Sequence, residues 1–268
     1  MATEGSSGFG PLRGKPHRNS FQSLEGNAAD GSFIGASWIL DKDRNGGLWC
    51  THGMAGIGDS TLETVKFTQM KYGDREDYAF LSSHELEYVA GTADRLLKAM
   101  VELDKSVSGY KITRLGHSLQ AATRAWKDGA DIDWVVCALL HDIGDIYAPY
   151  NHDEYAATIL RPFVREQCAW VVQTHGDFQM VYYAQHVGGN PNKRDAFKGN
   201  PYFDDCAEFC ETWDQSSFDP DYETKPLEFF TDMVREVFAR KAYAPDVVKK
   251  GVRLKLSDSA TAARRRAA

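Results

Sequence analysis

Residues 138–160 read ALLHDIGDIYAPYNHDEYAATIL, an apolar run that leads directly into the pair His141-Asp142. Another imidazole, His152, follows within the same stretch. Burial takes water away from both members of a His-Asp pair, and a buried carboxylate needs a compensating partner. A metal ion would compensate both groups at once. The stretch therefore predicts a metal site at the end of a buried helix, provided that the rest of the chain contributes further ligands.

A helical pattern extends from this stretch in both directions. Residues 131–145 predict a buried helix with Asp131 as its N-cap. Residues 83–104 have apolar side chains at helical spacing behind a serine cap. No strand-like alternation persists in this part of the chain, so we expect an all-α helical bundle. Further helices are predicted within residues 116–129, 152–163, 165–176, 203–215 and 226–243.

The two ends of the chain have a different character. Residues 1–82 are predicted to form an irregular, glycine-rich extension that is partly disordered, with a short hairpin between residues 32–40 and 46–50. The helical core is expected at residues 83–245. Residues 246–268 form a basic tail, which we expect to be solvated and mobile.

Composition limits the classes of function. The 268 residues are 43% hydrophobic and 12% aromatic, as in a globular protein with a real core. The formal net charge of −7 gives no indication of nucleic-acid binding. No apolar run reaches membrane-spanning length, and the N-terminus has no apolar signal region. We expect a cytoplasmic protein that acts on a small molecule as a monomer or dimer. Whether an N-terminal transit peptide is present stays an open question.

Four histidines and two aspartates stand at or near the ends of successive predicted helices. In a helical bundle such ends converge, and ligands from facing helices can enclose a metal. This nitrogen-rich set suits iron, manganese, zinc or nickel better than magnesium or calcium. A single buried histidine is more often a hydrogen-bonded core residue than a ligand, and it is the His-Asp pair with the regular placement of four histidines that favours a metal site. The six candidate ligands are His117, His141, Asp142, His152, His175 and Asp214.

The pattern His117, His141-Asp142 and Asp214 resembles the H…HD…D signature of the HD-domain superfamily, which is helical, binds divalent metals and consists mostly of phosphohydrolases. Residues 107–240 look most like its mixed-valent di-iron oxygenases. That group includes myo-inositol oxygenase and enzymes that cleave the carbon–phosphorus bond of hydroxyalkylphosphonates. The resemblance implies two iron ions (Fe²⁺ and Fe³⁺) and dioxygen as co-substrate. It also implies that Asp142 bridges the irons, with His152 and His175 completing the second.

Other family positions differ here. In the family a tyrosine can occupy an iron until substrate displaces it, and Tyr110 is the nearest candidate, since the chain has Val107 where one characterised pattern has that tyrosine. Asp145 stands where a substrate-contacting histidine is frequent, and we expect it to be catalytic. Gln179 replaces a phosphonate-binding lysine and Glu211 replaces an arginine. The resemblance therefore implies an intact metal site with an altered anion clamp.

The altered positions suggest a zwitterionic substrate. Acidic Asp145 and Glu211 stand near four aromatic residues in the sequence, an environment suited to an amine or quaternary ammonium group. A new anion clamp could come from the loop that follows. Alternatively, the aromatic residues are core and the lysines are solvated. The aromatic residues are Phe178, Tyr182, Tyr183 and Trp213, and the basic ones are Lys193, Arg194 and Lys198.

Four functions remain open at this stage. The first is an oxygenase that cleaves a carbon–phosphorus bond and releases phosphate. The second is a metal-dependent phosphohydrolase of nucleotides or phosphate esters, in which the same six ligands activate water. The third is an oxygenase that cleaves a carbon–carbon bond of a polyol. The fourth is a non-catalytic ligand-binding or regulatory protein, against which the six ligands argue.

Overall fold

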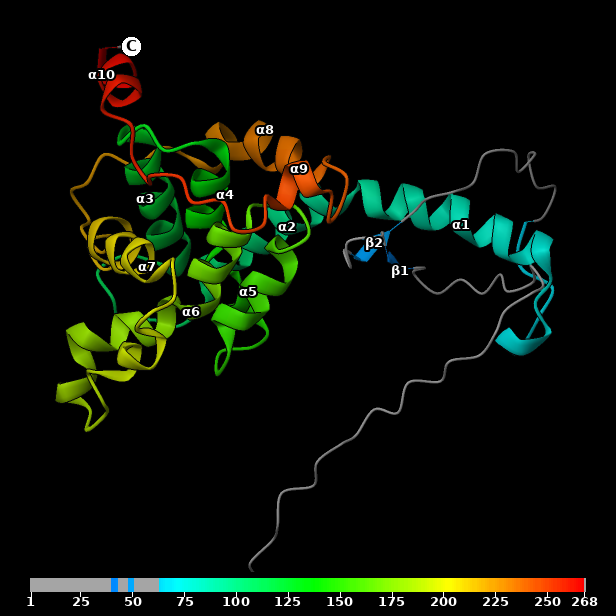
Figure 1. The fold of residues 1–268 in the computed structure, drawn as a ribbon, viewed down its shortest axis with the longest axis horizontal. Coiled ribbons are helices and arrows are strands. Elements are labelled where there is room, and N and C mark those ends of the chain that lie inside the picture. The colour runs from blue at the N-terminus through cyan, green and yellow to red at the C-terminus, as the bar shows by residue number, and fades with distance from the viewer. Residues whose placement is uncertain (1–39, 43–47, 51–62, 268) are drawn as a thin grey trace, which may run out of the picture. The chain divides into compact units, whose positions relative to one another are not determined.

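The computed structural model describes residues 40–42, 48–50 and 63–267. The chain divides into two units, residues 1–35 and 36–268, and the described residues all belong to the second. They are mainly helical (Figure 1), which confirms the all-α prediction. The α-helices are α1 (Arg75–Ala90), α2 (Thr92–Glu102), α3 (Arg114–Lys127), α4 (Ile132–Leu140), α5 (His152–Leu160), α6 (Glu166–Tyr183), α7 (Phe203–Phe209), α8 (Leu227–Phe238), α9 (Pro245–Val248) and α10 (Ser259–Ala267).

Short elements connect these helices. A two-stranded antiparallel hairpin pairs Leu40 with Cys50, close to where the sequence predicted one. Among the described residues, one short 3₁₀ segment precedes α1, and four more, with one π-helical segment, lie between the α-helices. The bounds are β1 (Leu40–Lys42), β2 (Leu48–Cys50), η1 (Met70–Tyr72), η2 (Leu103–Lys105), η3 (Ile143–Ile146), η4 (Ala184–His186), η5 (Lys193–Phe197) and the π-helix η6 (Cys210–Asp214).

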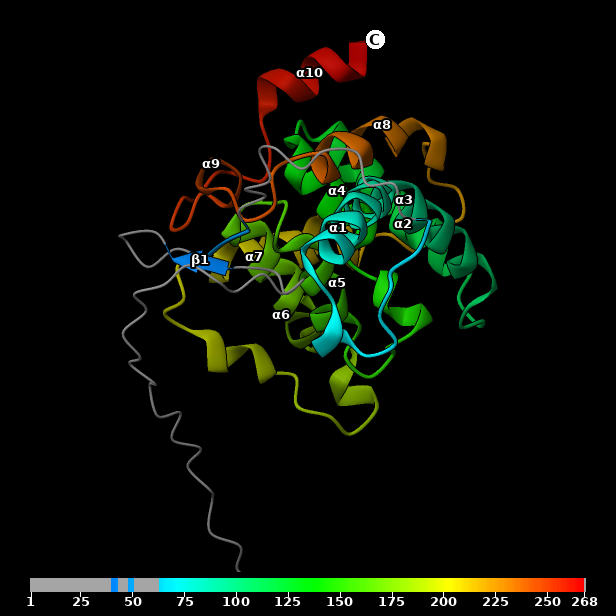
Figure 2. The ribbon, with the colours of Figure 1, turned by 90° about the vertical axis from the view of Figure 1, so that its right-hand side faces the viewer.

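Helix α4 forms the centre of the core. Every residue from Asp133 to Leu140 is buried, as expected for a helix that is apolar on all sides. Helix α3 packs along α4, and α8 packs against both α2 and α4 (Figure 2). Helix α5 packs on α6, which in turn contacts α7. As predicted, the side chain of Asp131 caps α4 by accepting the Trp134 N–H at 3.2 Å.

The first predicted helix, residues 83–104, has different bounds in the structure. Helix α1 begins at Arg75 because Asp74 and Asp77 form a capping box that satisfies the first backbone N–H groups. A single helix was also wrong, because α1 ends at Gly91 and α2 starts directly after it. The predicted serine cap is therefore an interior part of α1, and the helical pattern starts eight residues before residue 83.

Most C-terminal residues are exposed, which agrees with the expected solvated tail, but specific contacts attach the segment to the rest of the protein, and its mobility stays a prediction. Leu256 is buried, and the Asp258 N–H donates to the Asp128 carbonyl at 3.1 Å. Gly129, at φ +79°, permits this approach, because a Cβ there would lie 2.2 Å from the Asp258 carbonyl oxygen. The segment is thus held by specific contacts that its basic composition does not reveal.

No helix among the described residues is both long enough and apolar enough to cross a bilayer. The predicted domain boundaries and the predicted monomeric or dimeric state stay predictions.

Candidate metal centre

The fold brings all six candidate ligands together from five elements. Helix α3 contributes its first turn, the end of α4 contributes an adjacent pair, and α5 contributes its first residue. Helix α6 adds a histidine from its middle, and η6 adds its last residue. In that order the side chains are His117, His141 with Asp142, His152, His175 and Asp214.

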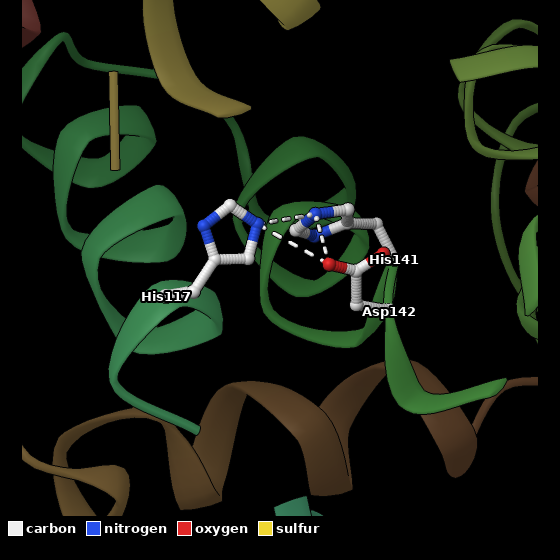
Figure 3. Close-up of side chains that lie close together, drawn as sticks. All are labelled: His117, His141 and Asp142. Atoms are coloured by element: carbon white, nitrogen blue, oxygen red, sulfur yellow. Dashed lines mark hydrogen bonds and ion pairs between the residues drawn. The ribbon is translucent and has the colours of Figure 1, made fainter. Parts of the chain in front are cut away.

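The carboxylate of Asp142 lies at the centre of this cluster and faces two ways. Its Oδ2 is 3.2 Å from His117 Nε2 and 3.3 Å from His141 Nε2 (Figure 3). Its Oδ1 is 3.4 Å from His152 Nε2 and 3.4 Å from His175 Nε2. Each side therefore offers a triplet of ligand atoms close enough together to hold a metal ion, and Asp142 belongs to both triplets. A third triplet, His141, His175 and Asp214, links the two sides.

Asp214 adds a second carboxylate on the Oδ2 side of Asp142. Its Oδ1 lies 3.2 Å from His117 Nε2 and 3.5 Å from His141 Nε2. Its Oδ2 is buried and has no hydrogen-bond partner. An unpartnered buried carboxylate oxygen costs free energy, so its presence among imidazole nitrogens fits a bound cation.

Three of the imidazoles are oriented by the backbone. In each, Nδ1 points away from the cluster toward a carbonyl oxygen, at 2.9 Å for His117, 2.8 Å for His141 and 2.6 Å for His175. A carbonyl only accepts, so Nδ1 carries a proton, and the ring can present an Nε2 lone pair to a metal once Nε2 has lost its own proton. This arrangement is the usual support for metal-binding histidines.

Charge pairing holds the cluster together without a metal. Burial alone would lower the pKa of His141, but the carboxylates of Asp142 and Asp214 outweigh it and raise that pKa well above its ordinary value. Burial alone would raise the pKa of both aspartates, yet the adjacent imidazoles hold those pKa values below the usual range. A divalent metal would replace the imidazole protons as the counter-charge of these carboxylates.

Two glycines leave the space in which His152 lies. A Cβ on Gly144, in η3, would lie 2.3 Å from the His152 carbonyl oxygen, so only glycine permits η3 to approach the start of α5. A Cβ on Gly176, next to His175 in α6, would lie 3.0 Å from Asp153 Oδ2 and 3.8 Å from His152 Cε1. The sequence HDIG thus contributes both a ligand pair and the space for the next ligand.

Asp214 owes its position to a π-helical turn. Helix α7 ends at Phe209, and the chain continues as η6, in which the Gln215 N–H donates to the Cys210 carbonyl at 2.9 Å. The sequence predicted one regular helix over residues 203–215, without this change. A π-turn inserts one residue and turns the following side chains, and such turns are frequent at functional sites.

A cavity of about 520 Å³ opens onto the cluster. Asp142, His152, His175 and Asp214 form part of its wall, and the remainder is mostly aromatic and polar. Its volume is within the range of small-molecule sites. The other lining residues are Val107, Tyr110, Arg114, Asp145, Pro149, Gly176, Gln179, Tyr182, Tyr183, Gln215 and Phe218.

The structure places the predicted substrate residues in two groups. Tyr110, Asp145, Gln179 and Tyr182 line the cavity, as does the aromatic residue Tyr183. The others that the sequence singled out do not line it; these are Lys193, Arg194, Lys198, Glu211, Phe178 and Trp213.

The predicted anion clamp is not formed in the structure. Lys193, the first residue of η5, pairs with Asp177, and Lys198, directly after η5, has its Nζ 2.8 Å from Asp195 Oδ2. Glu211 is exposed and accepts the hydroxyl hydrogen of Tyr182.

For two of the four aromatic residues the structure agrees with the alternative that they belong to the core. Phe178 and Trp213 are buried, and Phe178 lies against Phe203 and Trp213 against Phe209. Neither residue lines the cavity.

Tyr110 lines the cavity from the segment that precedes α3, whose N-cap is Thr113. Its ring stacks on Phe218 at 5.1 Å between centroids, and Phe218 stacks on His117 at 4.4 Å. Phe218 was not predicted, because its position depends on the loop after η6.

Arg114 is a second cavity residue that the sequence interpretation missed. Its guanidinium Nε donates to Asp145 Oδ2 at 2.7 Å, and Nη2 also reaches Asp142 Oδ2. Its place one helical turn before His117 was the available signal, since residues three apart share a helix face.

Comparison with known families agrees with this geometry. Residues 114–199 match the family model described as HD domain, a segment that includes five of the six cluster residues and ends before Asp214. No curated protein matches the chain. HD domains form a superfamily of mainly metal-dependent, phosphohydrolase-type enzymes. Residues 114–199 are therefore similar to an HD domain, and the histidine and aspartate clusters of the described residues could hold a metal ion.

Proposed function

We propose that this protein is a mixed-valent di-iron oxygenase that uses dioxygen to cleave the carbon–phosphorus bond of a hydroxyalkylphosphonate. The observation that carries the proposal concerns the carboxylate of Asp142. Its Oδ2 lies near His117 and His141, and its Oδ1 lies near His152 and His175. A site for a single metal needs no such sharing. Two adjacent metals require a bridging ligand, and a carboxylate between facing histidines supplies one.

The donor set suits iron. Four imidazoles and two carboxylates are ligands of intermediate hardness, which ferrous and ferric ions accept together. His117, His141, Asp142 and Asp214 would hold one ion, and Asp142 with His152 and His175 the other. Iron supplies the redox chemistry with dioxygen that no side chain of the cluster provides.

The cavity would hold and orient the substrate. The rings of Tyr110, Tyr182, Tyr183 and Phe218 line it, and aromatic faces attract quaternary ammonium groups. Gln179 adds an amide that donates and accepts hydrogen bonds. An amino- or trimethylammonio-hydroxyalkylphosphonate fits both the aromatic and the polar lining.

The proposed reaction balances without a further reductant. One hydroxyalkylphosphonate and one dioxygen give one carboxylic acid and one phosphate. The carbon–phosphorus bond and the carbon–hydrogen bond at the hydroxyl-bearing carbon break, and that carbon is oxidised to a carboxyl group while dioxygen is reduced. Both atoms of dioxygen therefore enter the products.

A metal-dependent phosphohydrolase is the second candidate, and the HD-domain match favours it because that superfamily is mainly hydrolytic. In that case the same six side chains would hold two divalent ions that activate water for attack on a phosphate ester. The new oxygen would come from water, and the reaction would proceed without dioxygen.

Oxygen dependence separates the two candidates. Iron-loaded protein would be supplied with a panel of hydroxyalkylphosphonates, including amino and trimethylammonio forms, with polyols and with phosphate esters. Dioxygen uptake and phosphate release would be measured together, in air and under nitrogen. We expect equal amounts of dioxygen consumed and phosphate released from one phosphonate, and no turnover under nitrogen.

Two other outcomes would each reject the proposal in a different way. Equal turnover under nitrogen would identify a hydrolase. Dioxygen uptake with a polyol and without phosphate would identify an oxygenase that cleaves a carbon–carbon bond.

A further inference from the structure

Arg114 occupies an unusual place in the cavity. Among the described residues that line it, Arg114 is the sole lysine or arginine. Its side chain is only 13% exposed, so its charge lies close to the cluster and away from bulk water. Two carboxylates compensate that charge, those of Asp142 and Asp145.

The two carboxylates do not hold Arg114 in the same way. Asp145 Oδ2 accepts from Nε at 2.7 Å and lies 2.6 Å from Nη2, so Asp145 grips one edge of the guanidinium. Asp142 accepts a hydrogen bond from Nη2 only, and it does so through Oδ2. That same oxygen faces the imidazoles of the cluster.

Arg114 Nη2 and a metal ion held by the imidazoles would therefore compete for Asp142 Oδ2. A metal between this oxygen and the imidazoles would take its lone pairs and much of its charge, which leaves the Nη2 edge of Arg114 with a weaker partner. Asp145 lies outside the triplets that can hold a metal and would keep its edge of the guanidinium. Asp145 would still balance the charge of Arg114, but the N–H donors released from Asp142 need another acceptor, and the open side of Arg114 is the cavity.

We propose that Arg114 is the specificity-determining residue that binds the anionic group of the substrate, and that Asp145 positions it. The ligand class is a tetrahedral oxyanion, a phosphonate or phosphate, because a planar guanidinium donates two parallel hydrogen bonds to two of its oxygens. The inference rests on the dinuclear site of the proposed function. It makes Asp145 a positioning residue, whereas the sequence suggested a catalytic one.

Two lysines of the loop that the sequence pattern favoured are engaged by other carboxylates. Lys193 pairs with Asp177 and Lys198 with Asp195, and neither lines the cavity. These two lysines are thus matched controls for Arg114, because they carry the same charge but do not reach the cavity wall.

A binding experiment with zinc-loaded protein tests the assignment without any oxygen chemistry. Titration calorimetry would measure the dissociation constant of methylphosphonate for the wild type, Arg114→Gln, Arg114→Lys, Lys193→Gln and Lys198→Gln. Loss of a charge-assisted pair weakens binding by about 10- to 100-fold, so we expect that loss in Arg114→Gln. Arg114→Lys, which keeps the charge without the fork, should be weakened less, and the two controls should match the wild type.

Metal content provides the readout that separates anion binding from a structural role. Arg114→Gln should still bind two zinc ions, because it removes a competitor for Asp142 and no ligand. Asp145→Asn should bind two zinc ions as well and weaken methylphosphonate by a smaller factor than Arg114→Gln. Acetate in place of methylphosphonate should bind more weakly, and inorganic phosphate should bind comparably.

Several results would overturn the assignment. These are unchanged methylphosphonate binding in Arg114→Gln, a loss of binding in Lys193→Gln or Lys198→Gln, or no binding by the zinc-loaded wild type. If Arg114→Gln does not fold, unchanged binding in Arg114→Lys would overturn it. Since zinc has no redox chemistry, a failure of the oxygenase proposal leaves these outcomes intact, and the reverse also holds.

Discussion

The two halves of the cluster differ in how firmly the protein holds them. The inner half, Asp142 Oδ2 with His117, His141 and Asp214, is buried throughout. In the outer half, Asp142 Oδ1 with His152 and His175, both histidines line the cavity and the side chain of His152 is 25% exposed, whereas neither histidine of the inner half lines the cavity. The halves share a single carboxylate but have different surroundings.

Support from the surrounding backbone follows the same division. Both inner imidazoles donate Nδ1 to a carbonyl, at 2.9 and 2.8 Å. In the outer half only His175 does so, while His152 Nδ1 lies 3.7 Å from Asp145 Oδ1, beyond hydrogen-bond distance. A half with four protein ligands and fixed rings should bind metal tightly. The outer half has fewer ligands and leaves positions open toward the cavity, as catalytic metal sites do.

Removal of the shared carboxylate should have the largest effect. Asp142→Ala takes a ligand from both halves, so we expect the purified protein to contain almost no iron, measured by plasma mass spectrometry. Asp177→Ala is the control, because this carboxylate is two residues from His175 but pairs with Lys193 outside the cluster. Full metal content in Asp142→Ala would refute the shared role.

A matched pair of histidine variants should separate the halves. His152→Ala should keep one iron per chain, bound as tightly as the tighter ion of the wild type. His141→Ala should lose that tight ion, because the inner half would then lack a fixed, buried donor. Competition with a chelator measures both affinities. Equal loss of affinity in the two variants would contradict the difference between the halves.

A glycine variant should disturb the outer half alone. Gly144→Ala forces a Cβ against the His152 backbone, so we expect the weaker metal to lose about 10- to 100-fold in affinity, as for other changes that misplace a ligand. Gly116→Ala is the control, because it lies beside His117 but its Cβ would meet nothing closer than 3.5 Å. An unaltered metal affinity in Gly144→Ala would show that His152 does not depend on this approach.

The smallest expected effect is that of Tyr110→Phe. The variant removes only a hydroxyl at the cavity wall and keeps the stack on Phe218. If the hydroxyl approaches an iron in the resting protein, the visible absorption of the iron-loaded protein should change while its iron content does not. An unchanged spectrum would exclude Tyr110 as an iron-contacting group.

The residues of the cluster were accessible to sequence analysis for a simple reason. Each is a histidine or aspartate at the end of, or within, a strongly patterned helix, and antiparallel helices bring such residues together. The HD pair after the apolar run of α4 marked where they meet. Helix positions and residue types were sufficient to predict the six cluster residues, because the packing of the helices brings these residues together.

The cavity was harder to predict from the sequence, because long-range contacts form it and helical periodicity does not reveal such contacts. Arg114 meets Asp145 from 31 residues away, and Phe218 stands beside His117 through the loop after η6. The π-turn that places Asp214 has no sequence signal of its own. Sequence proximity to His175 suggested Lys193 instead, although that lysine pairs with Asp177.

The central claim is that Asp142 joins two metal ions, and anomalous diffraction from crystals of the iron-loaded protein tests it most directly. Data on both sides of the iron absorption edge would locate each ion. We expect two peaks per chain about 3.5–4 Å apart, one between Asp142 Oδ2 and the imidazoles of His117 and His141, the other between Oδ1 and the imidazoles of His152 and His175. A single peak, or a second peak out of reach of Asp142, would contradict the account.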